Sequence, residues 1–203
     1  MTEDSYTALD IAKAGIESFY SRYDSDSDIF DHSMIAHETI AEVLKCHMIK
    51  LKTANLYACN QNVLSITASD EDELLSYFQD ECEKEIASMK SEKIDANISF
   101  YNILTKGISQ LAIYAGNESV VQVLRSGDYK RKFRIYASTI NTHFKNGERR
   151  KELLEQGAEI FHFFFNFLGL PHVCAERIFN CLSDEDLRTL MDACEPISRY
   201  QQS

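Results

Sequence analysis

The sequence predicts an all-α fold, a single bundle of about seven to nine helices. The 203 residues include only two prolines and seven glycines, well below the average usage of about 5% and 7%, so few positions interrupt a helix. Apolar residues recur every three or four positions along almost the whole chain, which is the period of an amphipathic helix. Because a chain of this length can bury about two thirds of its unfolded surface, we expect one domain over residues 1–203.

The first three helices are expected at about residues 5–23, 30–56 and 70–90. An acidic and serine-rich run at 24–28 ends the first apolar stripe, and a polar run at 60–62 ends the second. Ser69 and Asp72 have the spacing of a capping box, and the acidic first turn that follows suits the helix dipole. The stretch 57–69 is the best candidate for a hinge.

A fourth helix is expected at 95–115, where apolar residues occupy two faces. Such a helix belongs in the middle of a bundle. Gly116 should cap it in the left-handed conformation. Asn117 and Gly127 should then begin and end a short fifth helix, since asparagine favours the N-cap and glycine the C-terminal turn.

Two longer helices are expected at 128–145 and 148–168, separated by Asn146 and Gly147. Beyond them, Pro171 and Ser183 should open two short helices, and Asp186 lies three residues after Ser183 as in a capping box. We therefore expect a helical hairpin over residues 170–196 as a possible sub-unit.

The segment 160–168 is apolar on nearly every side, so either the protein's own core or a partner must cover it. His162 lies inside this run and could serve as an axial ligand to haem or a similar planar cofactor, with Phe161 and Phe165 beside it. A ligand-sensing bundle is therefore the alternative to an ordinary apolar core. Without such a ligand, no cofactor is expected.

Composition indicates a soluble cytoplasmic protein. The 21 basic and 32 acidic residues give a net charge of −11, which opposes binding to nucleic acid or to an anionic membrane. The six cysteines include no C-x-x-C pair, as expected for reduced thiols in a reducing compartment. The N-terminus is acidic, and no apolar run is long enough to cross a bilayer.

Residue patterns for catalysis or metal binding are missing from the sequence. No two histidines are three or four residues apart, and there is no nucleophile elbow or glycine-rich phosphate loop. Aspartates at 24, 26 and 28 match the start of a calcium loop, but Ile29 and Ile35 replace its essential glycine and glutamate. We therefore name no metal ligand and no catalytic residue; a metal or catalytic site assembled from residues dispersed over several helices stays an alternative.

A basic segment covers residues 125–151. It contains nine of the 21 basic residues and only two acidic ones, Asp128 and Glu148. It could bind phosphate, RNA or an acidic protein, or it could complement the acidic helix at 70–90 within the fold or in a homodimer. The candidate anion-binding residues are Lys130, Arg131, Lys132, Arg134, Arg149 and Arg150.

The apolar residues of the C-terminal hairpin have the spacing of an F-box, and the segment 170–194 resembles that family. The F-box is the helical module of ubiquitin-ligase substrate receptors that docks on the Skp1 adaptor. The resemblance implies adaptor contacts at Leu170, Pro171, Ile178, Phe179, Leu182 and Leu187. Two amphipathic helices that close a bundle would show similar spacing. The sequence thus favours a non-catalytic protein-interaction or regulatory module.

Overall fold

The computed structural model describes residues 8–20, 32–57, 73–168 and 172–199, with side chains except at 19–20, 32–34, 160–168, 172, 175–176 and 194–199. These ranges contain ten helices and one two-stranded sheet, which confirms the all-α class with slightly more helices than expected. The chain divides into two compact units, 1–89 and 90–203. The single domain stays a prediction, and the units are described separately.

Three helices of the first unit lie close to their predicted positions: α1 (Ala8–Tyr20), α2 (His32–Thr53) and α4 (Glu73–Ser91), the last crossing into the second unit. α1 packs against α2, and the buried residues on these helices include Leu9, Ala12 and Met48. α4 buries the stripe Cys82, Ile86 and Met89. The expected cap at Ser69 and, apart from Tyr57, the candidate hinge lie outside the described residues.

The second unit begins with a short antiparallel hairpin, β1 (Lys93–Asp95) and β2 (Ile98–Ser99). Two short helices follow, α5 (Phe100–Thr105) and α6 (Ile108–Tyr114). The prediction of one continuous helix over 95–115 is therefore wrong: a hairpin precedes α5, and a break separates α5 from α6.

Local capping explains this difference. The backbone N–H of Asn102 donates to Ser99 Oγ at 3.3 Å, and the N–H of Ser99 donates to Asn102 Oδ1 at 2.8 Å. This capping box starts α5 at Phe100. At the other end, Lys106 and Gly107 both have extended backbone, with ψ of 148° and 162°, so the helix stops before α6 begins.

α7 (Glu118–Ser126) agrees with the predicted fifth helix. Asn117 Oδ1 accepts hydrogen bonds from the N–H groups of Ser119 and Val120, at 3.0 and 3.4 Å. Gly127 ends the helix with a φ of 75°, a conformation that costs glycine least. Gly116 was expected to adopt this conformation too, but among the described glycines only Gly127 has a positive φ, so that prediction is wrong.

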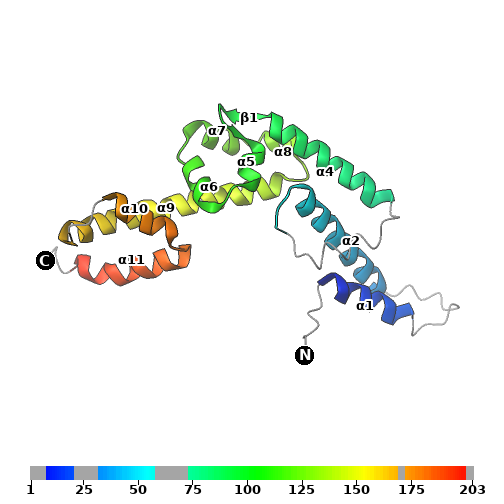
Figure 1. Ribbon diagram of the computed structural model, residues 1–203. Coiled ribbons are helices and arrows are strands. Elements are labelled where there is room, and N and C mark those ends of the chain that lie inside the picture. The colour runs from blue at the N-terminus through cyan, green and yellow to red at the C-terminus, as the bar shows by residue number, and fades with distance from the viewer. Residues whose placement is uncertain (1–7, 21–31, 58–72, 169–171, 200–203) are drawn as a thin grey trace. The chain divides into compact units, whose positions relative to one another are not determined.

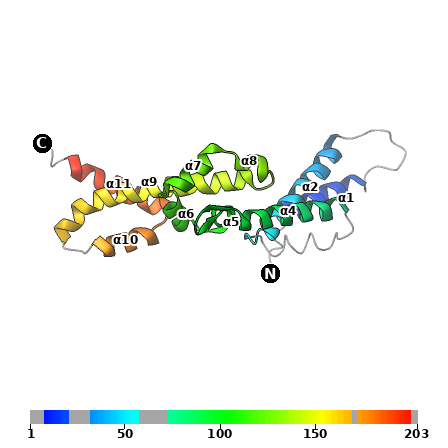
Figure 2. The ribbon, with the colours of Figure 1, turned by 90° about the horizontal axis from the view of Figure 1, so that it is seen from above.

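A single 32-residue helix, α9 (Ala137–Leu168), runs through the position at which two helices were expected to meet. The expected break at 146–147 is therefore wrong. Residues 129–132 instead form the separate turn α8 (Tyr129–Lys132), which lies beside the first half of α9 (Figure 2). Among the described elements, α5, α6, α8 and the two C-terminal helices pack on α9 (Figure 1), α6 most extensively.

Gly147 allows two helices to pack closely and does not form a turn. A Cβ atom at this position would lie 2.8 Å from both the Cβ and the carbonyl oxygen of Leu111 in α6. Because such distances are shorter than van der Waals contact, only glycine lets the α6 backbone approach α9 this closely. The buried core of the same unit also contains an aromatic pair, Phe100 and Phe133, whose ring centroids lie 4.9 Å apart.

We expect Gly147→Ala to lower the free energy of unfolding by about 1–3 kcal/mol. The added methyl group would overlap with backbone atoms of Leu111, which cannot move to another rotamer as a side chain can. The matched control is Gly157→Ala in the same helix. There the new Cβ would lie 3.6 Å from the Phe179 ring, an ordinary contact, and alanine's higher helix propensity should add up to about 1 kcal/mol. Urea denaturation of both variants checks this, and equal effects would contradict it.

Candidate interaction site in the C-terminal hairpin

The C-terminal hairpin consists of α10 (His172–Cys181) and α11 (Asp184–Arg199), and both helices pack against the second half of α9 (Figure 1). The predicted capping box opens α11. The backbone N–H and the hydroxyl of Ser183 donate to Asp186 Oδ2 at 3.1 and 2.6 Å, and the N–H of Asp186 donates back to Ser183 Oγ at 3.1 Å. The hydroxyl bond, followed by the backbone bond, lowers the pKa of Asp186 below its ordinary value.

This lowered pKa predicts a pH dependence of stability. The unfolded chain binds a proton at Asp186 more readily than the folded one, so stability rises with pH between the two pKa values. The contribution is complete above the ordinary aspartate pKa of roughly 4 and is lost as pH falls through the lower folded pKa. We expect the difference in melting temperature between wild type and Asp186→Asn to be steady near neutrality and to shrink in acid.

The control for this pH series is Asp192→Asn, which removes an exposed carboxyl of the same helix for which the described residues show no hydrogen bond. Its difference from wild type should not follow the same acid transition. A pH-independent difference for Asp186→Asn would contradict the role of the carboxylate in the cap.

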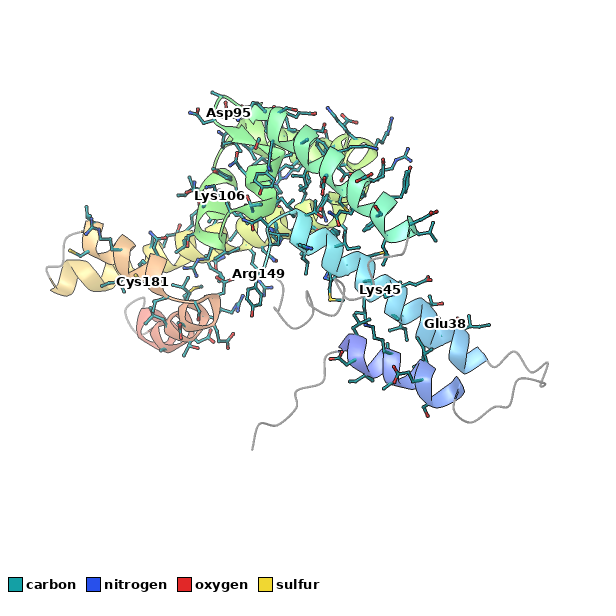
Figure 3. All side chains as sticks on the ribbon, turned by 45° about the vertical axis from the view of Figure 1, so that its right-hand side comes forward. Glu38, Lys45, Asp95, Lys106, Arg149 and Cys181 are labelled. Atoms are coloured by element: carbon teal, nitrogen blue, oxygen red, sulfur yellow. The ribbon has the colours of Figure 1, made fainter. Side chains whose placement is uncertain are left out.

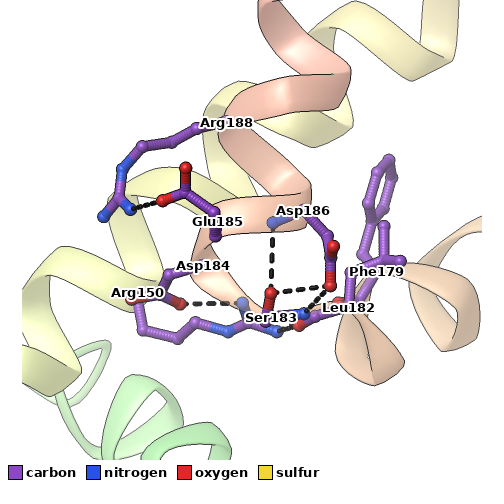
Figure 4. Close-up of polar contacts among 8 residues, drawn as sticks. All are labelled: Arg150, Phe179, Leu182, Ser183, Asp184, Glu185, Asp186 and Arg188. Atoms are coloured by element: carbon purple, nitrogen blue, oxygen red, sulfur yellow. Dashed lines mark hydrogen bonds and ion pairs between the residues drawn. The ribbon is translucent and has the colours of Figure 1, made fainter.

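Arg150 of α9 forms hydrogen bonds that connect the hairpin to α9 (Figure 4). Its guanidinium donates to Asp184 Oδ1 at 2.9 Å and to the carbonyl oxygens of Phe179 and Leu182 at 3.0 and 2.7 Å. These carbonyls lie at the C-terminal end of α10, where the helix leaves acceptors unpaired and the dipole favours a cation. One side chain thus stabilises the end of α10 and pairs with the first residue of α11.

The burial of Arg150 corrects one sequence prediction. Arg150 was expected to bind an external anion, but only 2% of it is exposed. Because its two terminal NH2 groups donate to the hairpin and solvent does not reach it, it is a structural cation and not part of a surface patch. Arg150, Leu153 and Gly157 share one face of α9 at helical spacing, and this pattern could have indicated its position.

A small apolar cluster completes the contact between the hairpin and α9. Phe179 and Leu187 are buried against Leu153, and Leu182, Leu190 and Met191 pack partly buried around them. Phe179 and Leu187 were expected to contact a partner protein; in this structure they are buried between the hairpin and α9. Leu170 and Pro171, named with them, lie outside the described residues.

The opposite face of α10 is exposed. Val173 and Ile178 are 61% and 44% exposed, and Cys174 and Cys181 are exposed free thiols. Helical spacing places these four residues on one side of the helix, away from buried Phe179, and exposed Arg177 lies among them. Cys181 is labelled in Figure 3. The structure therefore separates adjacent residues of the F-box-like pattern: Phe179 lies inside and Ile178 outside.

The basic segment divides into paired and exposed cations. Arg125 pairs with Glu148 at 2.8 Å, Lys151 with Glu155 at 3.3 Å, and Lys132 with Glu92, which directly follows α4. The remaining cations of the segment are exposed, with no ion pair to another described residue. They are Lys130, Arg131, Arg134, Lys145 and Arg149.

The cofactor candidates His162, Phe161 and Phe165 belong to α9, but their side chains lie outside the described set. Within the described ranges, no three histidine, cysteine, aspartate or glutamate side chains gather as metal ligands. The absorption spectrum of the purified protein is the direct test of a haem-like ligand, because a bound haem absorbs visible light.

Comparison of the chain with protein-family models, curated proteins and solved structures gives no match. The F-box resemblance therefore depends on the spacing of residues 170–194 alone. None of the described helices is long and apolar enough to span a bilayer.

Proposed function

We propose that this protein is a non-catalytic, intracellular interaction module that binds another protein through the outer face of α10. The observation that supports this proposal is the two-sided character of the helix. Phe179 and the Arg150 hydrogen bonds fix α10 on α9, while Val173 and Ile178 remain exposed on the other side. This face is apolar except for exposed Arg177. Because the helix is held in a fixed position, the face can dock into a groove with little loss of conformational entropy.

The F-box resemblance suggests the Skp1 adaptor as the partner. Of the residues that match the family pattern, Ile178 is the one with an exposed side chain among those described, while Leu182 is partly buried. In this proposal Ile178 contacts the adaptor, and Phe179, Leu182 and Leu187 hold the hairpin in the conformation that presents it.

Titration of the purified protein with purified Skp1, followed by calorimetry, tests the proposal. Ile178→Asp should weaken binding about tenfold or more, since it places a charge at the centre of an apolar contact. The matched control is Thr189→Asp, which adds the same charge to an exposed position of α11, outside the proposed face of α10. Its affinity should stay close to that of wild type.

Two outcomes would contradict this proposal. If the wild-type protein does not bind Skp1, the proposal of an F-box-like partner is wrong. If wild type and Ile178→Asp bind Skp1 with equal affinity, the outer face of α10 is not the binding surface. Both variants should melt at nearly the wild-type temperature, because each replaces an exposed side chain.

A further inference from the structure

A second surface lies on the α8 turn and involves none of the residues of the C-terminal hairpin. Buried aromatic residues alternate there with exposed cations: Tyr129, Phe133 and Tyr136 are buried, whereas Lys130, Arg131 and Arg134 are exposed. Phe100 packs against the rings of Tyr129 and Phe133, with centroid distances of 5.8 and 4.9 Å. The backbone that carries the three cations is therefore anchored in the core.

Few acidic residues lie close in sequence to neutralise the positive charge of this surface. Asp128 is the one acidic residue between 125 and 134, and Lys132 is paired with Glu92. The end of the Lys130 side chain lies over the left-handed turn at Gly127, where its Nζ would be 3.8 Å from an added Cβ. This turn is the C-terminal end of α7, so the helix dipole favours a cation there.

We propose that Lys130, Arg131 and Arg134, which we term the α8 basic surface, bind an acidic segment of a partner protein. Two guanidinium groups and one ammonium within five residues offer several donors to neighbouring carboxylates, and arginine can hold a carboxylate with two parallel hydrogen bonds. Because the turn is fixed by its buried rings, little backbone freedom is lost when a partner binds.

Two observations favour a protein over a nucleic acid at this surface. Single-stranded nucleic acids are bound largely by stacking bases on aromatic side chains, and the aromatic residues of this segment, Tyr129, Phe133 and Tyr136, are buried. The net charge of −11 repels a long nucleic acid, which carries many phosphates, more strongly than a short acidic peptide, which carries few carboxylates. A small group of cations suits a few carboxylates better than a long phosphate backbone.

Fluorescence anisotropy of the full chain with two probes tests this inference. The probes are a labelled oligoglutamate peptide and a labelled oligothymidylate of equal net charge. Wild type should bind the peptide more tightly than the oligothymidylate, and added salt should weaken this binding. Arg131→Glu/Arg134→Glu should weaken peptide binding at least about fivefold, since two cation–carboxylate contacts become repulsive.

The matched control is Lys93→Glu/Lys106→Glu, which makes the same change of charge at two exposed positions of the same unit; Lys106 is labelled in Figure 3. This variant should bind the peptide with nearly wild-type affinity. If it loses as much affinity as the Arg131/Arg134 variant, overall charge and not the α8 basic surface governs binding, and the inference fails.

Two further results would overturn the inference. One is a wild-type protein that binds no peptide at low salt, and the other is equal or tighter binding of the oligothymidylate, which would assign the surface to nucleic acid. Circular dichroism checks that each variant keeps its helices. If charge reversal disturbs folding, Arg131→Gln/Arg134→Gln replaces it, and this neutral variant should weaken binding and reduce its salt dependence.

Discussion

Arg150→Ala is expected to lower the free energy of unfolding by about 3 kcal/mol. Removal of one partner from a buried ion pair costs roughly 3–5 kcal/mol, and we take the lower end because Asp184 is 33% exposed and can regain water. The carbonyl of Leu182 would also lose the Arg150 donor, and that of Phe179 would keep only the backbone N–H of Leu182 at 3.1 Å, which adds to the cost. Urea denaturation measures the loss.

Arg149→Ala is the control for this prediction, because the neighbouring arginine is exposed and has no ion pair among the described residues. It should change stability by less than about 0.5 kcal/mol. Hydrogen exchange adds a local readout: amides of α10 and α11 should lose protection in Arg150→Ala and keep it in Arg149→Ala. Similar small effects of both substitutions would show that Arg150 does not hold the hairpin.

Phe179→Asp is expected to destabilise the protein by more than about 3 kcal/mol. Truncation of a buried phenylalanine to alanine alone costs roughly 3–5 kcal/mol, and aspartate places an unpaired charge in the space that the ring leaves. The ring lies 3% exposed against Leu153 and Leu187. The hairpin should therefore separate from α9, which denaturation and loss of amide protection in α10 and α11 would both record.

Ile178→Asp is the natural comparison, since the adjacent side chain is 44% exposed. Its melting temperature should remain close to that of wild type. The pair also tests which residues serve recognition. If Phe179→Asp instead keeps wild-type stability and helicity but loses affinity for Skp1, Phe179 would be a partner contact, and the internal packing described above would be wrong.

Features that depend on a few neighbouring residues could be predicted from the sequence. Asn117 and Gly127 bound α7 as expected, and Ser183 with Asp186 opens α11 through the expected capping box. Each of these contacts joins residues within about four positions. The capping box at Ser99 and Asn102 is equally local and could have been predicted, but the apolar pattern of 95–115 concealed it.

Features that depend on distant residues could not be predicted. Asn146 and Gly147 have the composition of a turn, yet α9 continues through them because Leu111 of α6 fills the space above Gly147. Arg150 follows Arg149 in the same basic run, yet one is buried and the other is exposed. Composition treats the two arginines alike, so the expected anion site included both.

The sequence by itself therefore determined the helical class, most helix positions and their caps, because these depend on backbone preferences and on side chains within one or two turns. The tertiary structure alone decided which member of each adjacent pair, Arg149 or Arg150 and Ile178 or Phe179, is available to a partner. The partners of Arg150 are 29 to 34 residues away in sequence. Burial at that range follows from how helices pack: the spacing of Arg150 with Leu153 and Gly157 indicates a shared face of α9, but only the tertiary structure shows that the hairpin covers it.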